Sequence, residues 1–118
     1  MAKIDYDMLV RDNYPSILEC GGKKKCNVST INETDFLDRL ADKLEDEVGG
    51  FLSEYDAEND ERALNKLADI TEVVSSIIAA FGMTEDAFAR LCDARRAMYG
   101  AFDSKILLES IEDVDGKG

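Results

Sequence analysis

The stretch that decides the fold is FLDRLADKLEDEVGGFL, residues 36–52. Its apolar side chains recur every three or four positions, which places them on one face of an α-helix. They are Phe36, Leu37, Leu40, Leu44, Val48, Phe51 and Leu52. The sequence therefore predicts an amphipathic helix from about Glu33 to Ser53. Thr30 followed by Glu33 fits a capping box at its start, and Asn32 fits the cap equally well.

Similar signals predict helices on both sides of this stretch. Residues 61–81 are predicted to form a second long helix. Its last half is apolar nearly all round, so we expect this helix to be the central and most buried one. Thr84 caps a third helix, which ends at Tyr99 before a glycine. Pro15 favours a short helix over 15–20 that stops at two glycines.

The predicted fold class is therefore all-α: a bundle of three main helices with a short N-terminal helix. With 118 residues, the chain has room for one domain. We expect that domain to cover residues 1–108 and to be followed by a solvated tail over 109–118.

Composition excludes several classes of function. The chain has 14 Lys and Arg against 26 Asp and Glu, a net charge of −12. This balance argues against binding to a nucleic-acid backbone or to an anionic membrane surface, which need clustered cations. The chain has no His, which excludes imidazole-based catalytic pairs and metal ligands.

Location is predicted from the same residues. Acids stand near the start of the chain, where a signal peptide needs an apolar run. The most apolar stretch, residues 70–81, is too short and too polar to span a bilayer. Cys20, Cys26 and Cys92 show no metal-ligand spacing and are expected to be reduced thiols. We therefore expect a cytoplasmic protein with no membrane or nucleic-acid partner.

Some carboxylates fall where an apolar residue is expected. Glu47 lies on the line of the apolar stripe of residues 36–52, and Asp69 and Glu72 lie three apart on the next helix. A charge on a core-facing helix needs a partner or a metal ion. Converging carboxylates suit Mg²⁺ or Mn²⁺. They can equally pair with Lys43, Lys66 or Arg62.

Four segments resemble a known family. They are YDMLVRDNYP at 6–15, KLEDEVGGF at 43–51, LADITEVV at 67–74 and YGAF at 99–102. In this order and over residues 6 to about 108, the chain resembles the MazG-like all-α nucleoside triphosphate pyrophosphohydrolases, in the phosphoribosyl-ATP pyrophosphohydrolase-like branch. The LVRD segment with its following proline is the most specific of these pieces.

The resemblance implies an activity. Family members use Mg²⁺ to cleave a nucleoside triphosphate into a monophosphate and pyrophosphate, usually as dimers or larger assemblies. Carried over to this chain, Glu47 and Asp69 match metal ligands, Glu72 is a further candidate ligand, and Asp46 matches an acid that activates the attacking water. The residues that we expect to contact the nucleotide are Arg11, Asn13, Lys66 and Lys105.

The chain also departs from the family pattern. Gly50 and Lys66 stand where two more carboxylate ligands are expected. The first hypothesis is a house-cleaning pyrophosphohydrolase with a remodelled Mg²⁺ site. The alternative is an inactive member of the same fold that binds a nucleotide or another protein and needs no cofactor. A third hypothesis is an acidic protein that targets a basic partner. If the site has lost its metal, the Lys66 ammonium should lie within roughly 4 Å of Glu47 or Asp69.

Self-association is predicted as well. Phe81, Phe88, Met98 and the apolar residues in 102–108 offer more apolar surface than one small domain can cover. We therefore expect a symmetric homodimer.

Overall fold

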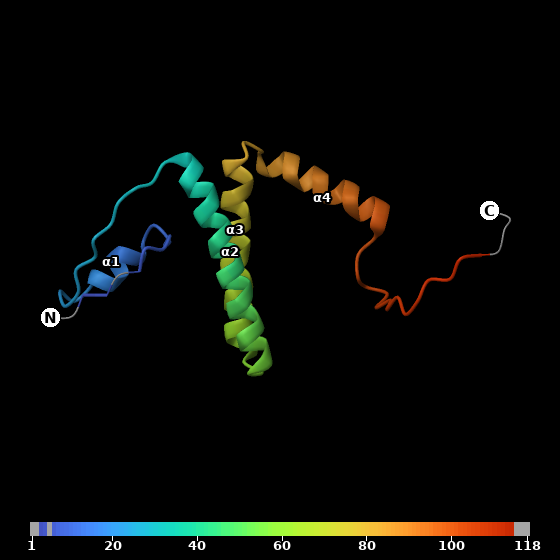
Figure 1. The fold of residues 1–118 in the computed structure, drawn as a ribbon, viewed down its shortest axis with the longest axis horizontal. Coiled ribbons are helices and arrows are strands. Elements are labelled where there is room, and N and C mark those ends of the chain that lie inside the picture. Colours follow the sequence, from blue (N-terminus) through green and yellow to red (C-terminus); the bar gives the residue numbers. More distant parts are fainter. Residues whose placement is uncertain (1–2, 5, 115–118) are drawn as a thin grey trace. The chain divides into compact units, whose positions relative to one another are not determined.

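The structure is a computed structural model that describes residues 3–4 and 6–114. These residues form four α-helices: α1 (Tyr14–Glu19), α2 (Glu33–Asp56), α3 (Asp60–Ala80) and α4 (Glu85–Tyr99) (Figure 1). The described part of the chain contains no strand. The predicted all-α class is confirmed, and the more specific MazG-like fold stays a prediction.

Both long helices begin at an asparagine cap. The Asn32 side chain accepts a hydrogen bond from the Asp35 backbone N–H at 2.8 Å, so Asn32, and not Thr30, caps α2. The Asn59 side chain accepts one from the Arg62 N–H at 3.1 Å and caps α3. The helix α2 continues three residues past the predicted end at Ser53.

The chain divides into two compact units, Met1–Glu85 and Asp86–Gly118. In the first unit, α2 and α3 are joined by residues 57–59 and pack side by side as an antiparallel hairpin (Figure 1). The second unit contains most of α4 and the segment after it, and no residue of α4 is buried. The predicted division into residues 1–108 and 109–118 stays a prediction.

The core of the hairpin is thin. Leu40, Ala63 and Val73 are its buried apolar residues, at 4%, 8% and 6% exposure. The prediction that α3 is the most buried helix is not confirmed, since α2 and α3 contain two buried residues each and Ala79 and Ala80 of α3 are exposed. The reason is geometric: α2 packs against α3 along one side and leaves the rest of its surface open.

Helical periodicity gives the hairpin two different flanks. Val48, Leu52 and Tyr55 of α2 lie beside the core stripe, and so do Leu64 and Leu67 of α3; all five are exposed. Because the helices run antiparallel, these residues share one side of the hairpin, which we call the apolar face. Arg39, Lys43 and Asp46 of α2 and Asp69 of α3 lie on the other side of the core stripe.

Among the described helices, no single one is both long and apolar enough to cross a bilayer. Only α3 and α4 taken together, with the break between them, meet the length and composition that a span requires.

Candidate functional site

Glu47 is the centre of the candidate site. It lies on α2 in the same stripe as Leu40 and Phe51, and only 9% of its surface is exposed. Among the described residues it is the only buried charged one. A carboxylate that is removed from water to this degree requires a compensating charge.

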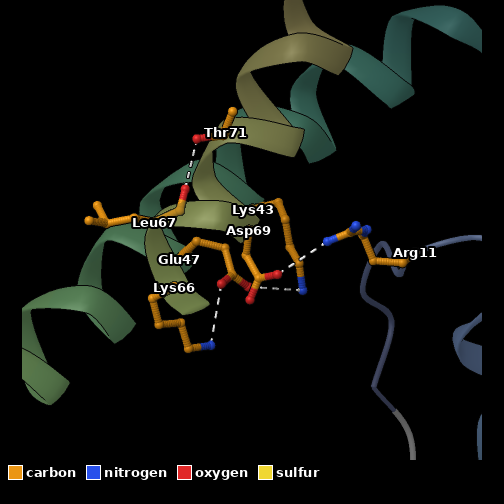
Figure 2. Close-up of polar contacts among 7 residues, drawn as sticks. All are labelled: Arg11, Lys43, Glu47, Lys66, Leu67, Asp69 and Thr71. Atoms are coloured by element: carbon orange, nitrogen blue, oxygen red, sulfur yellow. Dashed lines mark hydrogen bonds and ion pairs between the residues drawn. The ribbon is translucent and has the colours of Figure 1, made fainter. Parts of the chain in front are cut away.

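Two ammonium groups supply that charge. The Lys66 Nζ of α3 donates a hydrogen bond to Glu47 Oε2 at 3.3 Å, and the Lys43 Nζ lies 3.6 Å from Glu47 Oε1 (Figure 2). Lys43 stands four residues before Glu47, one helical turn away. Each carboxylate oxygen thus has its own cation. The prediction that Lys66 reaches this carboxylate is confirmed.

Gly50 makes room for Lys66. A Cβ atom added at Gly50 would lie 3.0 Å from Lys66 Cε, 3.1 Å from Cδ and 3.4 Å from Nζ. A Cβ added at the neighbouring Gly49 would meet nothing within 4 Å. The missing side chain at position 50 therefore gives the lysine stem its path to Glu47. The two departures from the family pattern, Gly50 and Lys66, form one packing arrangement.

A third cation faces the second carboxylate. Arg11, from the segment before α1, donates from Nη1 to Asp69 Oδ1 at 3.2 Å (Figure 2). Both side chains are largely open to water, so this pair contributes roughly 0.2–1 kcal/mol. Arg11, Lys43 and Lys66 with Glu47 and Asp69 form what we call the ion cluster. It holds three cations against two carboxylates.

The ion cluster does not fit a divalent metal. Mg²⁺ and Mn²⁺ need carboxylate oxygens that are free to coordinate, and both Glu47 oxygens already face ammonium groups. The cluster also carries an excess of one positive charge, which repels a dication. Within the described residues, no group of three or more Asp, Glu or Cys side chains is arranged to hold a metal ion.

The ion pairs of the ion cluster do not include the predicted residues Glu72, Asn13 and Lys105. Glu72 is exposed on α3, one turn beyond Asp69. Asn13 directly precedes α1, where its carbonyl accepts a hydrogen bond from the Ile17 N–H. Lys105 lies in the second unit. The structure therefore unites Glu47 and Asp69 with cations, and not with the third predicted ligand.

A cleft of about 330 Å³ lies beside the cluster on α2. Its walls are the segment 6–9 and the helix residues Arg39, Asp42, Lys43 and Asp46. The volume is at the lower end of the range for small-molecule sites. Asp46, the predicted catalytic acid, is exposed and lines this cleft. Lys43 belongs to both the cleft and the ion cluster.

Arg39 holds the segment 6–9 against α2. Its Nη1 donates to the Asp7 carbonyl at 2.9 Å, and its Nη2 donates to Asp7 Oδ2 at 3.2 Å. The sequence analysis did not identify Arg39 or Asp7. Helical spacing places Arg39 on one side of α2 with Lys43 and Asp46, so that signal was available. Nothing local indicates its partner, which lies 32 residues away.

Comparison of the chain with family models, curated proteins and solved structures finds no match. The resemblance to the MazG-like family therefore rests on the motifs quoted above. The family fold and its reaction remain predictions.

The fit between Gly50 and Lys66 predicts a coupled response to alanine. Gly49→Ala should raise the free energy of unfolding by about 1 kcal/mol, because alanine is the better helix former and meets nothing. Gly50→Ala should give less than this gain, since its Cβ displaces Lys66 from Glu47. In a Lys66→Ala background the two glycine substitutions should raise the free energy of unfolding by equal amounts. Urea unfolding of the wild type and the five variants measures the coupling. If Gly50→Ala raises the free energy of unfolding equally in both backgrounds, the packing account is contradicted.

Proposed function

We propose that this chain is a catalytically inactive, metal-independent member of the MazG-like fold that binds a nucleotide-like small molecule. The observation that carries the proposal is the Lys66 ammonium on Glu47, admitted by Gly50. A pyrophosphohydrolase needs a divalent cation at this point to bind and polarise the phosphates. An ammonium with its own carboxylate supplies no open coordination position, so the inactive alternative is favoured over the hydrolase.

The cleft supports a nucleotide-like ligand of low charge. Tyr6 offers an aromatic ring of the kind on which bases stack, and Arg39 and Lys43 are cations of the kind that bind phosphate. Asp42 and Asp46 line the same cleft. Without a divalent cation to shield them, these two carboxylates repel a triphosphate strongly. A nucleoside or a nucleoside monophosphate is therefore the proposed ligand class.

The proposed assembly is a homodimer through the apolar face. A single two-helix hairpin with three buried apolar residues has too small a core to be stable alone. A second copy related by a two-fold axis would cover the apolar face with an identical apolar face and complete a four-helix bundle. The five residues that define this face carry no charge, so the net charge of −12 does not oppose the contact locally. A basic partner would instead be drawn to acids elsewhere on the chain.

The proposed location is the cytoplasm. Cys20, Cys26 and Cys92 are all free thiols. Free thiols are typical of proteins in reducing compartments.

The test is an activity and stability assay with both metals. The protein should release no pyrophosphate from a panel of nucleoside triphosphates with Mg²⁺ or with Mn²⁺. Millimolar Mg²⁺ should leave the melting temperature unchanged within roughly 1 °C, because no folded-state site binds it. Calorimetric titration should detect binding of a nucleoside monophosphate both with and without Mg²⁺.

Metal-dependent release of pyrophosphate would contradict the proposal and favour the hydrolase. Asp46→Asn is then the control, since loss of the release in this variant would assign the activity to the chain and not to a contaminant.

A further inference from the structure

The Arg39 guanidinium is bound by one residue, Asp7, while its side chain is still 40% exposed. Two of its N–H groups donate to two oxygens of that residue, the backbone carbonyl at 2.9 Å and Oδ2 at 3.2 Å. A guanidinium can bind two oxygens of a phosphate or a carboxylate with the same two N–H groups. The backbone and side-chain oxygens of Asp7 therefore occupy donors that a phosphate could use.

The ion pair between Arg39 and Asp7 is weak enough for another anion to replace it. The Asp7 side chain is 87% exposed, so water competes for its carboxylate and the ion pair is weak. Asp7 also has φ 48°, in the left-handed region that aspartate and asparagine adopt more readily than most residues. The weak ion pair is therefore what a stronger ligand for Arg39 has to replace.

We propose that Arg39 binds the phosphate of a nucleoside monophosphate in the cleft, and that Asp7 occupies Arg39 until the ligand replaces it. The proposal rests on the proposed function, because it takes its ligand class from there. It adds the residue that holds the phosphate and a competing group within the chain.

The charges in the cleft make anion binding depend on the replacement of Asp7 at Arg39. With Asp7 in place, Asp7, Asp42 and Asp46 outnumber Arg39 and Lys43. Lys43 is shared with Glu47 at 3.6 Å. Arg39 is thus the main cation available to an anion, and only after the Asp7 carboxylate has left it. Incoming phosphate must compete with that carboxylate, which lowers the apparent affinity.

Asp7→Asn tests the exchange. The substitution removes the charge, and asparagine tolerates positive φ and keeps its backbone carbonyl for Arg39. The matched control is Asp38→Asn, which changes the net charge equally at an exposed α2 position outside the cleft. Adenosine and cytidine monophosphates, the two free nucleosides and inorganic phosphate are titrated into each protein by calorimetry. Asp7→Asn should bind the monophosphates roughly two- to fivefold more tightly, the range for loss of a surface ion pair.

A second readout follows the guanidinium itself. The Arg39 side-chain NMR signal, assigned by its loss in Arg39→Gln, should shift in Asp7→Asn without ligand. In the wild type it should shift on addition of the monophosphate and not on addition of the nucleoside. Arg39→Gln should bind monophosphate no better than nucleoside.

The outcomes separate the two claims. If the wild type binds monophosphates and Asp7→Asn binds them no more tightly, the exchange is overturned and the proposed function stands. If free phosphate alone reproduces the effect, the site is specific for phosphate and the nucleotide class is overturned. Binding by no protein in the series overturns both.

Discussion

Lys66→Glu combined with Gly50→Glu should make the stability of the hairpin depend on Mg²⁺. The double variant gathers carboxylates at positions 47, 50, 66 and 69, where the wild type holds Glu47 between two ammonium groups. Without metal it should lose about 2–3 kcal/mol of unfolding free energy, since the buried Glu47 carboxylate loses one of its two ammonium partners and gains like charges. At a Mg²⁺ concentration of 100 times its Kd, about 2.7 kcal/mol should return.

The matched control is Lys66→Glu combined with Gly49→Glu. It makes the same change in charge, but position 49 faces open space, away from Lys66. This variant should be destabilised in the same way and should regain much less stability with Mg²⁺. Thermal unfolding with and without Mg²⁺ measures all three proteins. Equal Mg²⁺ stabilisation of the wild type would show that the native cluster already binds the ion.

Leu64→Gln combined with Leu67→Gln should dissociate the proposed dimer. These leucines are 64% and 41% exposed in the single chain and lie at the centre of the apolar face. Buried between two copies, they would together contribute about 2–4 kcal/mol per protomer. Because leucine and glutamine have similar helix propensities, the substitution leaves the isolated helix unchanged. Analytical ultracentrifugation at micromolar concentration should show a dimer for the wild type and a monomer for the variant, and far-UV circular dichroism should show reduced helicity for the variant.

Asn65→Gln serves as the control for this experiment. Asn65 is exposed and lies one helical turn before Asp69, on the side of α3 away from the apolar face, so its substitution should change neither mass nor stability. A wild-type monomer at micromolar concentration would refute the proposed assembly.

Local sequence patterns predicted the helices well. Their apolar spacing and caps depend on residues within a few positions of one another, and the predicted helix over 61–81 is observed as Asp60–Ala80. Burial was predicted less well. Apolar content along α3 suggested a central helix, but burial depends on which other elements pack around it, and periodicity does not contain that information.

The residues of the site also differ in whether local sequence patterns could predict them. Glu47 was identified because it interrupts an apolar stripe, and Lys66 because it stands three residues before Asp69 on the same helix. The contact of Asp69 with Arg11 spans 58 residues, and no local pattern indicates it. The cleft was missed for this reason as well, since one of its walls comes from the segment 6–9.

The fit between Gly50 and Lys66 also limits how this chain can evolve. A side chain acquired first at position 50 crowds the Lys66 stem and strains its contact with Glu47, while loss of Lys66 first leaves Glu47 with Lys43 alone. Either single step towards a carboxylate site passes through a less stable intermediate. Selection should therefore hold the two positions as a pair, and lineages that share this lysine should also keep the glycine.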